Sequence, residues 1–156
     1  MKKLLKVILM TLLMLCMSVN LVGCSQYREE KYARKRVVTY FDIEVPQKAK
    51  MAYNYYEMWQ EAMGYTVFTF EKEPTAWLRE SGFHKEQDEE FESVADDKTN
   101  RFFEFSKRTD NILSEEYVPD FEKEYFWKEY TEGKSDTIFL IYLPEKLMLV
   151  FYLERW

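Results

Sequence analysis

The sequence predicts an α+β fold in which a mostly antiparallel β-sheet, a meander with a strong C-terminal hairpin, packs against one or two helices on a face. Segments with strand patterns outnumber helical ones and are joined by short turns, and two segments near the C-terminus are continuously apolar. The composition is 47% hydrophobic, 18% aromatic and 32% charged, with four glycines and four prolines, which is typical of a globular domain. A length of 156 residues gives room for one such domain.

Alternating apolar residues predict a half-buried strand over 37–45 (VVTYFDIEV), which Pro46 ends. The next segment is ambiguous. Apolar and polar residues alternate over 48–56 as in a strand, but apolar residues also recur there at helical spacing, with Gly64 placed as a helix stop. We favour the strand over 48–56.

The middle of the chain contains one clear strand and two helical segments. YTVFTFE, residues 65–71, is typical of a strand. PTAWLRESG, residues 74–82, predicts a short helix with its proline near the start and Gly82 at the C′ position. A further helix is expected within 85–113, where it would bury three apolar side chains: Phe91, Val94 and Ala95.

The C-terminus, residues 124–156, gives the strongest pattern: a strand, a loop, a strand, a tight turn and a strand. Gly133 and Ser135 mark the first turn. Pro144 suits the second position of a type I turn over 143–146. The apolar runs TIFLIYL and LMLVFYL indicate strands that are covered on both faces or lie at the centre of the sheet.

The first 24 residues have the organisation of an export signal. A basic start, MKKLLK, precedes an apolar stretch that ends with small residues before Cys24. The alternative is a retained membrane-spanning helix, which needs about 18 consecutive apolar residues. The stretch reaches that length only if Thr11, Ser18 and Asn20 are counted. We therefore expect cleavage between Gly23 and Cys24.

LVGC, residues 21–24, resembles the lipobox of bacterial lipoproteins. The resemblance implies that a diacylglyceryl group is attached to the sulfur of Cys24, and that a peptidase cleaves after Gly23. It also implies a mature protein anchored on the extracytoplasmic face of the cell membrane, where two acyl chains suffice for stable attachment. The body of the chain resembles, more loosely, small tyrosine-rich lipoproteins of bacterial genomes. This resemblance implies no particular function. Cys16 would be lost with the leader, so no disulfide is expected.

These signals divide the chain into a signal peptide (1–23), a lipid-anchored charged tether (24–35) and a single globular domain (36–156). The alternative for the tether is a short solvated helix, because its glutamates and basic residues are spaced for i,i+4 pairing. The leader has three lysines and no acid, so the remaining chain has 19 basic and 28 acidic residues and a net charge of −9. Such a surface repels nucleic acid and anionic lipid except at local basic patches. We expect no nucleic-acid partner.

We predict no catalytic residue, no metal site and no cofactor. His84, the only histidine, is interpreted as a surface residue, and no G-x-S-x-G motif is present. Zinc requires clusters of Cys and His. In DDKTN, residues 96–100, Lys98 stands where an EF-hand loop needs an oxygen ligand, and Arg101, which follows the segment, stands where the loop needs a glycine. Four glycines form no phosphate-binding loop.

Two other patterns remain as candidate sites. Carboxylates in 86–92 and 114–124 could supply the acid and base of a glycosidase, but 28 acidic residues make close pairs expected from composition alone. Aromatic residues in AYNYYEMWQ and EYFWKEY could stack on sugars or contact a protein, or could fill a core that lacks disulfides. The candidate binding-surface residues are Tyr53, Tyr55, Tyr56, Trp59 and Trp127.

The function we expect is that of a membrane-anchored lipoprotein of the bacterial cell envelope, non-catalytic, that binds a protein or a cell-wall component. One alternative is a surface inhibitor or immunity-type protein that neutralises a basic toxin or hydrolase, because acidic charge would speed capture of a cationic enzyme. A third is a cell-wall glycan hydrolase, which needs a groove with two carboxyls about 5–10 Å apart. An exposed aromatic patch without a cleft favours the first hypothesis, and a protruding acidic loop favours the second.

Overall fold

The computed structural model describes residues 26–58, 61–85, 87–130 and 136–155. Gly23, Cys24 and Trp59 lie outside these ranges. After a helix over 26–41, called here the N-terminal helix, the elements are β1 (Lys50–Met58), β2 (Ala62–Thr69), α2 (Thr75–Glu80), α3 (Glu89–Ser106), the 3₁₀ helix η1 (Glu115–Tyr117), β3 (Phe126–Tyr130), β4 (Thr137–Leu143) and β5 (Met148–Arg155).

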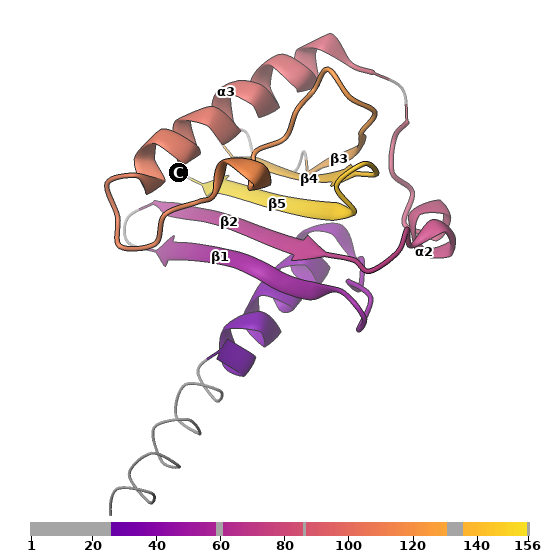
Figure 1. Ribbon diagram of the computed structural model, residues 1–156, viewed down its shortest axis with the longest axis horizontal. Coiled ribbons are helices and arrows are strands. Elements are labelled where there is room, and N and C mark those ends of the chain that lie inside the picture. The colour runs from indigo at the N-terminus through magenta and orange to yellow at the C-terminus, as the bar shows by residue number, and fades with distance from the viewer. Residues whose placement is uncertain (1–25, 59–60, 86, 131–135, 156) are drawn as a thin grey trace, which may run out of the picture.

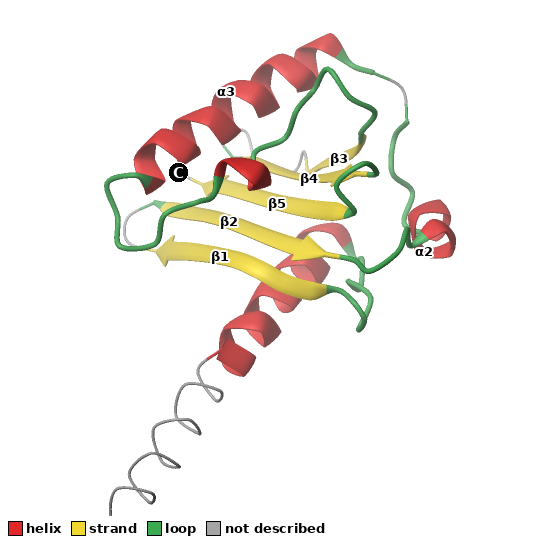
Figure 2. Ribbon diagram, viewed as in Figure 1, coloured by secondary structure: helices red, strands yellow, loops and turns green. Residues whose placement is uncertain are grey.

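The strands of the described ranges form one antiparallel sheet in the order β1-β2-β5-β4-β3. A hairpin (β1–β2) and a C-terminal meander (β3–β4–β5) join where β5 pairs with β2. Figure 2 shows this sheet with helices on either side. The predicted α+β class and the C-terminal hairpin are confirmed. The strand favoured over 48–56 is confirmed as β1, and the one over 65–71 as β2.

Helices cover both faces of the sheet, which therefore has two hydrophobic cores (Figure 1). The N-terminal helix packs Ala33, Val37 and Phe41 against one face. On the opposite face, α3 contributes Phe91 and Phe102. Successive residues of β4 and β5 enter the two cores alternately, because side chains of a strand alternate between faces. This confirms that the two apolar runs are covered on both sides.

The predicted strand over 37–45 is wrong in its first half, where the N-terminal helix continues to residue 41. Asp42 ends the helix with φ of +53°, and its N–H donates to the carbonyl oxygen of Val38 at 2.9 Å, as in an αL cap. Only 43–45 is extended, with Ile43 and Val45 buried. The described part of the segment expected as a tether or a short helix, 26–35, is helical, so residue 36 lies inside a continuous helix.

The two helices expected in the middle of the chain are confirmed as α2 and α3. Gly82 follows α2 with φ of +66°, the left-handed conformation expected at C′. Phe91 and Ala95 are buried as predicted, but Val94 is 40% exposed. Val94 points outward because the buried stripe of α3 continues from Ala95 to Thr99 and Phe102, at a spacing of three to four residues.

The β4–β5 turn lies one residue later than predicted. Leu143 pairs with Met148, so four residues connect the strands, and the N–H of Leu147 donates to the carbonyl oxygen of Pro144 at 3.1 Å. Pro144 is thus the first residue of this turn rather than the second. The connection closes because Leu147 adopts a left-handed conformation, with φ of +47°.

Candidate functional site

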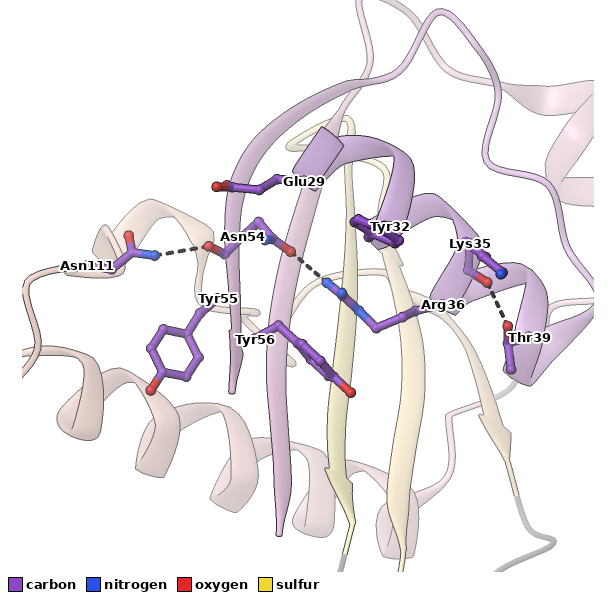
Figure 3. Close-up of a pocket in the computed structure, with 9 residues that line it drawn as sticks. All are labelled: Glu29, Tyr32, Lys35, Arg36, Thr39, Asn54, Tyr55, Tyr56 and Asn111. Carbon is purple, nitrogen blue, oxygen red and sulfur yellow. Dashed lines mark hydrogen bonds between the residues drawn. The ribbon is translucent and has the colours of Figure 1, made fainter. Parts of the chain in front are cut away.

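A hollow of about 680 Å³ lies between the N-terminal helix and the outer edge of β1 (Figure 3). It combines aromatic rings, two cationic side chains and two amides, and its lining includes two of the predicted binding residues. The lining residues are Glu29, Tyr32, Lys35, Arg36, Thr39, Asn54, Tyr55, Tyr56 and Asn111.

Helical periodicity explains the wall that the N-terminal helix provides. Glu29, Tyr32, Arg36 and Thr39 follow one another at intervals of three to four positions, which places their side chains on one face of a helix, and Lys35 flanks this face. The alternation of β1 supplies the opposite wall: Asn54 and Tyr56 point toward the helix, whereas Tyr55 points to the other side of the strand (Figure 3). Asn111 reaches this edge from the α3 side, and its Nδ2 donates to the carbonyl oxygen of Asn54 at 2.9 Å.

Arg36 is the central group of the hollow. Its Nη2 donates to Oδ1 of Asn54 at 2.8 Å, and the hydroxyl of Thr66 donates to the same oxygen at 2.9 Å. Its guanidinium carbon lies 4.2 Å from the centre of the Tyr56 ring, a cation–π distance. Burial lowers the pKa of Arg36, while Tyr56 and Tyr40 raise it. Guanidinium nevertheless stays charged in proteins.

The positive charge of Arg36 is not matched by a carboxylate in the described ranges of the chain. In the same ranges its Nε is buried and has no hydrogen-bond acceptor. Buried polar groups are usually paired, and leaving one unpaired is costly. Asn54 and Tyr56 therefore hold Arg36 in place. Its positive charge and part of its N–H donors are not paired with other described residues.

A glycine on β2 sets the position of Tyr56. Gly64 pairs with Tyr56 across the strands, and a Cβ added at Gly64 would lie 3.1 Å from Cδ2 of the tyrosine ring. Because glycine has no side chain, the ring can lie close against β2, with 38% of the residue exposed. The close contact with Gly64 thus holds the Tyr56 ring in position for its cation–π interaction with the guanidinium of Arg36.

A second arginine fastens the helical wall. Arg34 forms a salt bridge with Glu30 at 2.6 Å, and its guanidinium donates to three backbone carbonyl oxygens, those of Val45, Pro46 and Ala49, at 3.1, 3.0 and 2.5 Å. Its side chain is 16% exposed. These bonds tie the N-terminal helix to the segment that leads into β1, and so fix the two walls of the hollow relative to each other.

The other predicted binding residues do not gather at this hollow. Tyr53 is buried in the core facing α3, where its hydroxyl donates to the carbonyl oxygen of Asn111 at 2.9 Å. Burial raises the pKa of Tyr53 to about 12. Trp127 lies on β3, at the opposite edge of the described sheet, and stacks on Phe91 with ring centres 4.2 Å apart. His84 is exposed, and its ring centre lies 4.5 Å from that of Trp127.

The acidic segment before α3 has a local structural role. Asp88 is the N-cap of α3, and its Oδ1 accepts hydrogen bonds from the N–H groups of Glu90 and Phe91, each at 3.0 Å. Burial, and then Asp88 and Glu90, raise the pKa of Glu129. The DDKTN segment lies within α3 instead of forming a loop.

Two further hollows offer less for binding. One of about 600 Å³ lies along α3 and is lined largely by charged residues. Another, of about 1010 Å³, is lined by residues of 46–50 and 70–74. There Lys50 forms a salt bridge with Glu71 at 2.9 Å, so these two side chains neutralise each other.

Sequence reasoning identified Tyr55 and Tyr56 but missed Arg36, Tyr32 and Asn111. From Glu29 onward, polar residues recur at the spacing of one helix face, and this pattern could have predicted the wall that the N-terminal helix provides. Asn111 gave no signal, since it meets β1 only in the folded chain.

The fold and the hollow define a small α+β protein with helices on both faces of its sheet and an aromatic, cationic groove at one sheet edge. No helix in the ranges described is both long and apolar enough to cross a membrane. The chain matches no protein-family model, and neither a curated protein nor a solved structure shows significant similarity to it. Its function is therefore inferred from its own residues.

Proposed function

We propose that this protein is a non-catalytic binding protein of the bacterial cell envelope, anchored to the extracytoplasmic face of the cell membrane through lipid on Cys24. Its ligand site is the hollow between the N-terminal helix and β1. The observation that carries this proposal is the state of Arg36, a cation that Asn54 and Tyr56 fix in the wall of the hollow and that forms no ion pair with a carboxylate among the described residues.

The chemistry of the lining suits binding more than catalysis. Arg36 and Lys35 supply charged donors, Asn111 and Asn54 supply amides, and the tyrosines supply ring faces for a ligand with apolar or sugar surfaces. Glu29 is the single carboxylate of the lining, whereas the acid–base hydrolysis of glycosides uses two. These groups favour recognition of a ligand that carries negative charge.

The ligand site can be tested in living cells with a photo-crosslinking amino acid. We expect benzoylphenylalanine in place of Tyr32 or Tyr56 to give an adduct of defined mass after illumination. The matched control is Val94, which is exposed on α3 and does not line the hollow. Adducts that form equally at Val94 and at the two tyrosine positions, or at none of them, would contradict the proposal.

The anchor is tested by the intact mass of protein extracted from membranes, beside a Cys24→Ser variant. We expect a mature chain that begins at Cys24 and carries added acyl mass, and we expect this species to be absent from the variant. An unmodified full-length chain in the membrane fraction would contradict the lipid anchor, as would release of both forms into the medium.

A second candidate function is inhibition of a basic toxin or hydrolase, and the distribution of charge favours it. Residues 42–156 contain 14 basic and 26 acidic residues, a net charge of −12. Near η1 the acidic side chains of Glu115, Glu116 and Asp120 are exposed. A cationic cell-wall hydrolase such as lysozyme would be attracted to this surface. Inhibition of lysozyme that is reduced severalfold in a Glu115→Gln, Glu116→Gln variant would support this function, and absence of inhibition at low ionic strength would contradict it.

A further inference from the structure

The length of the chain between Cys24 and the hollow limits how far the two can lie apart. From residue 26 to Arg36 the N-terminal helix rises about 15 Å, at about 1.5 Å per residue. The two steps from Cys24 to residue 26 add at most about 7 Å. If Cys24 carries the lipid, as the proposed function has it, the Cα atom of Arg36 lies within about 22 Å of the anchored residue. The hollow therefore opens close to the membrane surface.

The part of the protein nearest the proposed anchor is also its most basic part. The N-terminal helix has five basic and two acidic residues, a net charge of +3, against −12 for the rest of the chain after it. Arg28, Lys31 and Lys35 are exposed on this helix. Anionic lipid would attract the helix and repel the remaining domain, which turns the hollow toward the bilayer.

Aromatic residues on the same helix fit the same partner. Tyr27 is 73% exposed and Tyr32 is 57% exposed, which is high for such large side chains. Tyrosine is enriched at membrane–water interfaces because it has an apolar ring and a polar hydroxyl. Tyr32 also lines the hollow, so the surface that would face the lipid continues into the ligand site.

We propose that the hollow binds the headgroup of an anionic membrane phospholipid. This assignment rests on the proposed function, since it names the ligand of the same site. Arg36 and Lys35 donate to the lipid phosphate, and the ring of Tyr56 packs against the glycerol unit. Glu29, the one carboxylate of the lining, lies two helical turns before Arg36, about 10 Å along the axis. Its backbone is therefore separated along the helix from a phosphate bound at Arg36.

The test uses the mature chain with Cys24→Ser, so that attachment through lipid does not mask binding through the hollow. The described residues of both hydrophobic cores lie within 33–153, and the mature chain contains all of them. We expect this chain to bind vesicles that contain phosphatidylglycerol at least tenfold more tightly than vesicles of phosphatidylcholine alone. Free glycerol phosphate should compete only at much higher concentration.

Matched variants on one helix separate specific binding from general charge attraction. Arg36→Gln and Lys35→Gln each remove one positive charge from the lining, and Arg28→Gln and Lys31→Gln remove one from the same helix outside it. We expect the first pair to weaken binding to phosphatidylglycerol vesicles about tenfold and the second pair about twofold or less. Lys35 is exposed, so its variant should keep the wild-type melting temperature even if Arg36→Gln lowers it.

Three results would overturn the lipid assignment. Equal losses in all four variants would show attraction by surface charge without a site. Equal affinity for free glycerol phosphate and for vesicles would identify a soluble phosphate compound as the ligand. A protein adduct at position 56 in the cellular cross-linking experiment would also overturn it, while leaving the proposed binding function intact.

Discussion

Arg34 and Arg36 lie two positions apart on the N-terminal helix but use their guanidinium groups differently. Arg34 gives its donors to Glu30 and to three backbone carbonyls, so its role is to hold the fold. Within the described residues, the guanidinium of Arg36 donates a hydrogen bond only to Asn54, and it lies over the ring of Tyr56. The contrast separates an arginine that builds the wall of the hollow from one that is left available to a ligand.

Replacing Arg34 by methionine should lower the free energy of unfolding by about 2–4 kcal/mol, because carbonyl oxygens that accept from a charged group would lose their donor. Urea denaturation measures the change. The matched control is Arg101→Met, which removes an exposed pair with Asp97 and should cost less than about 1 kcal/mol. Similar losses in both variants would show that the bonds of Arg34 contribute little.

Glu129 should make stability depend on pH. Burial and the nearby carboxylates of Asp88 and Glu90 raise its pKa above 4.5. Glu129 therefore binds its proton more tightly in the folded state than in the unfolded chain. The stability that this proton contributes is complete below pH 4.5 and is lost as pH rises through the raised pKa. Glu129→Gln should therefore melt at the wild-type temperature near pH 4 and at a higher temperature at pH 7. A difference in melting temperature that does not change with pH would contradict this.

At the scale of elements, the acid-rich segment before α3 is a helix start. Asp88→Ala should destabilise the protein by about 1 kcal/mol, because two N–H groups at the start of α3 would lose their acceptor. Asp88→Ser should restore most of this loss, since serine also caps helices. Chemical denaturation of the two variants checks the prediction, and equal stability of both would argue against the cap.

The sequence predicted the C-terminal strands well and the N-terminal helix poorly, for a definite reason. Continuously apolar runs of seven residues bounded by turn signals, as in β4 and β5, are typical of strands buried on both sides. In the N-terminal helix, Ala33, Val37 and Phe41 are spaced by four. Residues four apart share a face in a helix and also in a strand, since four is even and close to 3.6.

The same ambiguity concealed most of the candidate site. Because 37–45 was assigned to a strand, nothing in the sequence placed the basic residues before it on a helix that lies beside Tyr56. The choice between helix and strand is made by contacts distant in the sequence, such as the bonds from Arg34 to Val45 and Ala49. Tyr55 and Tyr56 were found because a run of aromatics is visible without knowledge of the fold.

At the scale of the whole molecule, buried phenols should set the alkaline limit of stability. Burial raises the pKa of Tyr53, Tyr55, Tyr125 and Tyr142 from 10.0 to about 12, and it raises the pKa of Tyr65 well above its ordinary value. Phenols with a raised pKa contribute stability that is complete below pH 10 and is lost as pH rises toward 12.

We therefore expect unfolding between pH 10 and 12, in which tyrosinate absorbance near 295 nm rises together with the loss of the far-ultraviolet circular dichroism signal. Ionisation of every tyrosine near pH 10 with the secondary structure intact would contradict the burial described for these side chains.

The position of β5 links the order of synthesis to the order of folding. It follows the other strands of the described sheet in sequence, yet it lies between β2 and β4, and its pairing with β2 joins residues 79 to 93 positions apart. The described sheet cannot close until β5 is available, and contacts this distant in sequence form slowly. For a protein that crosses a membrane as an extended chain, as the proposed export requires, this delay is useful. On that route, the sheet would fold only after β5 has reached the far side of the membrane.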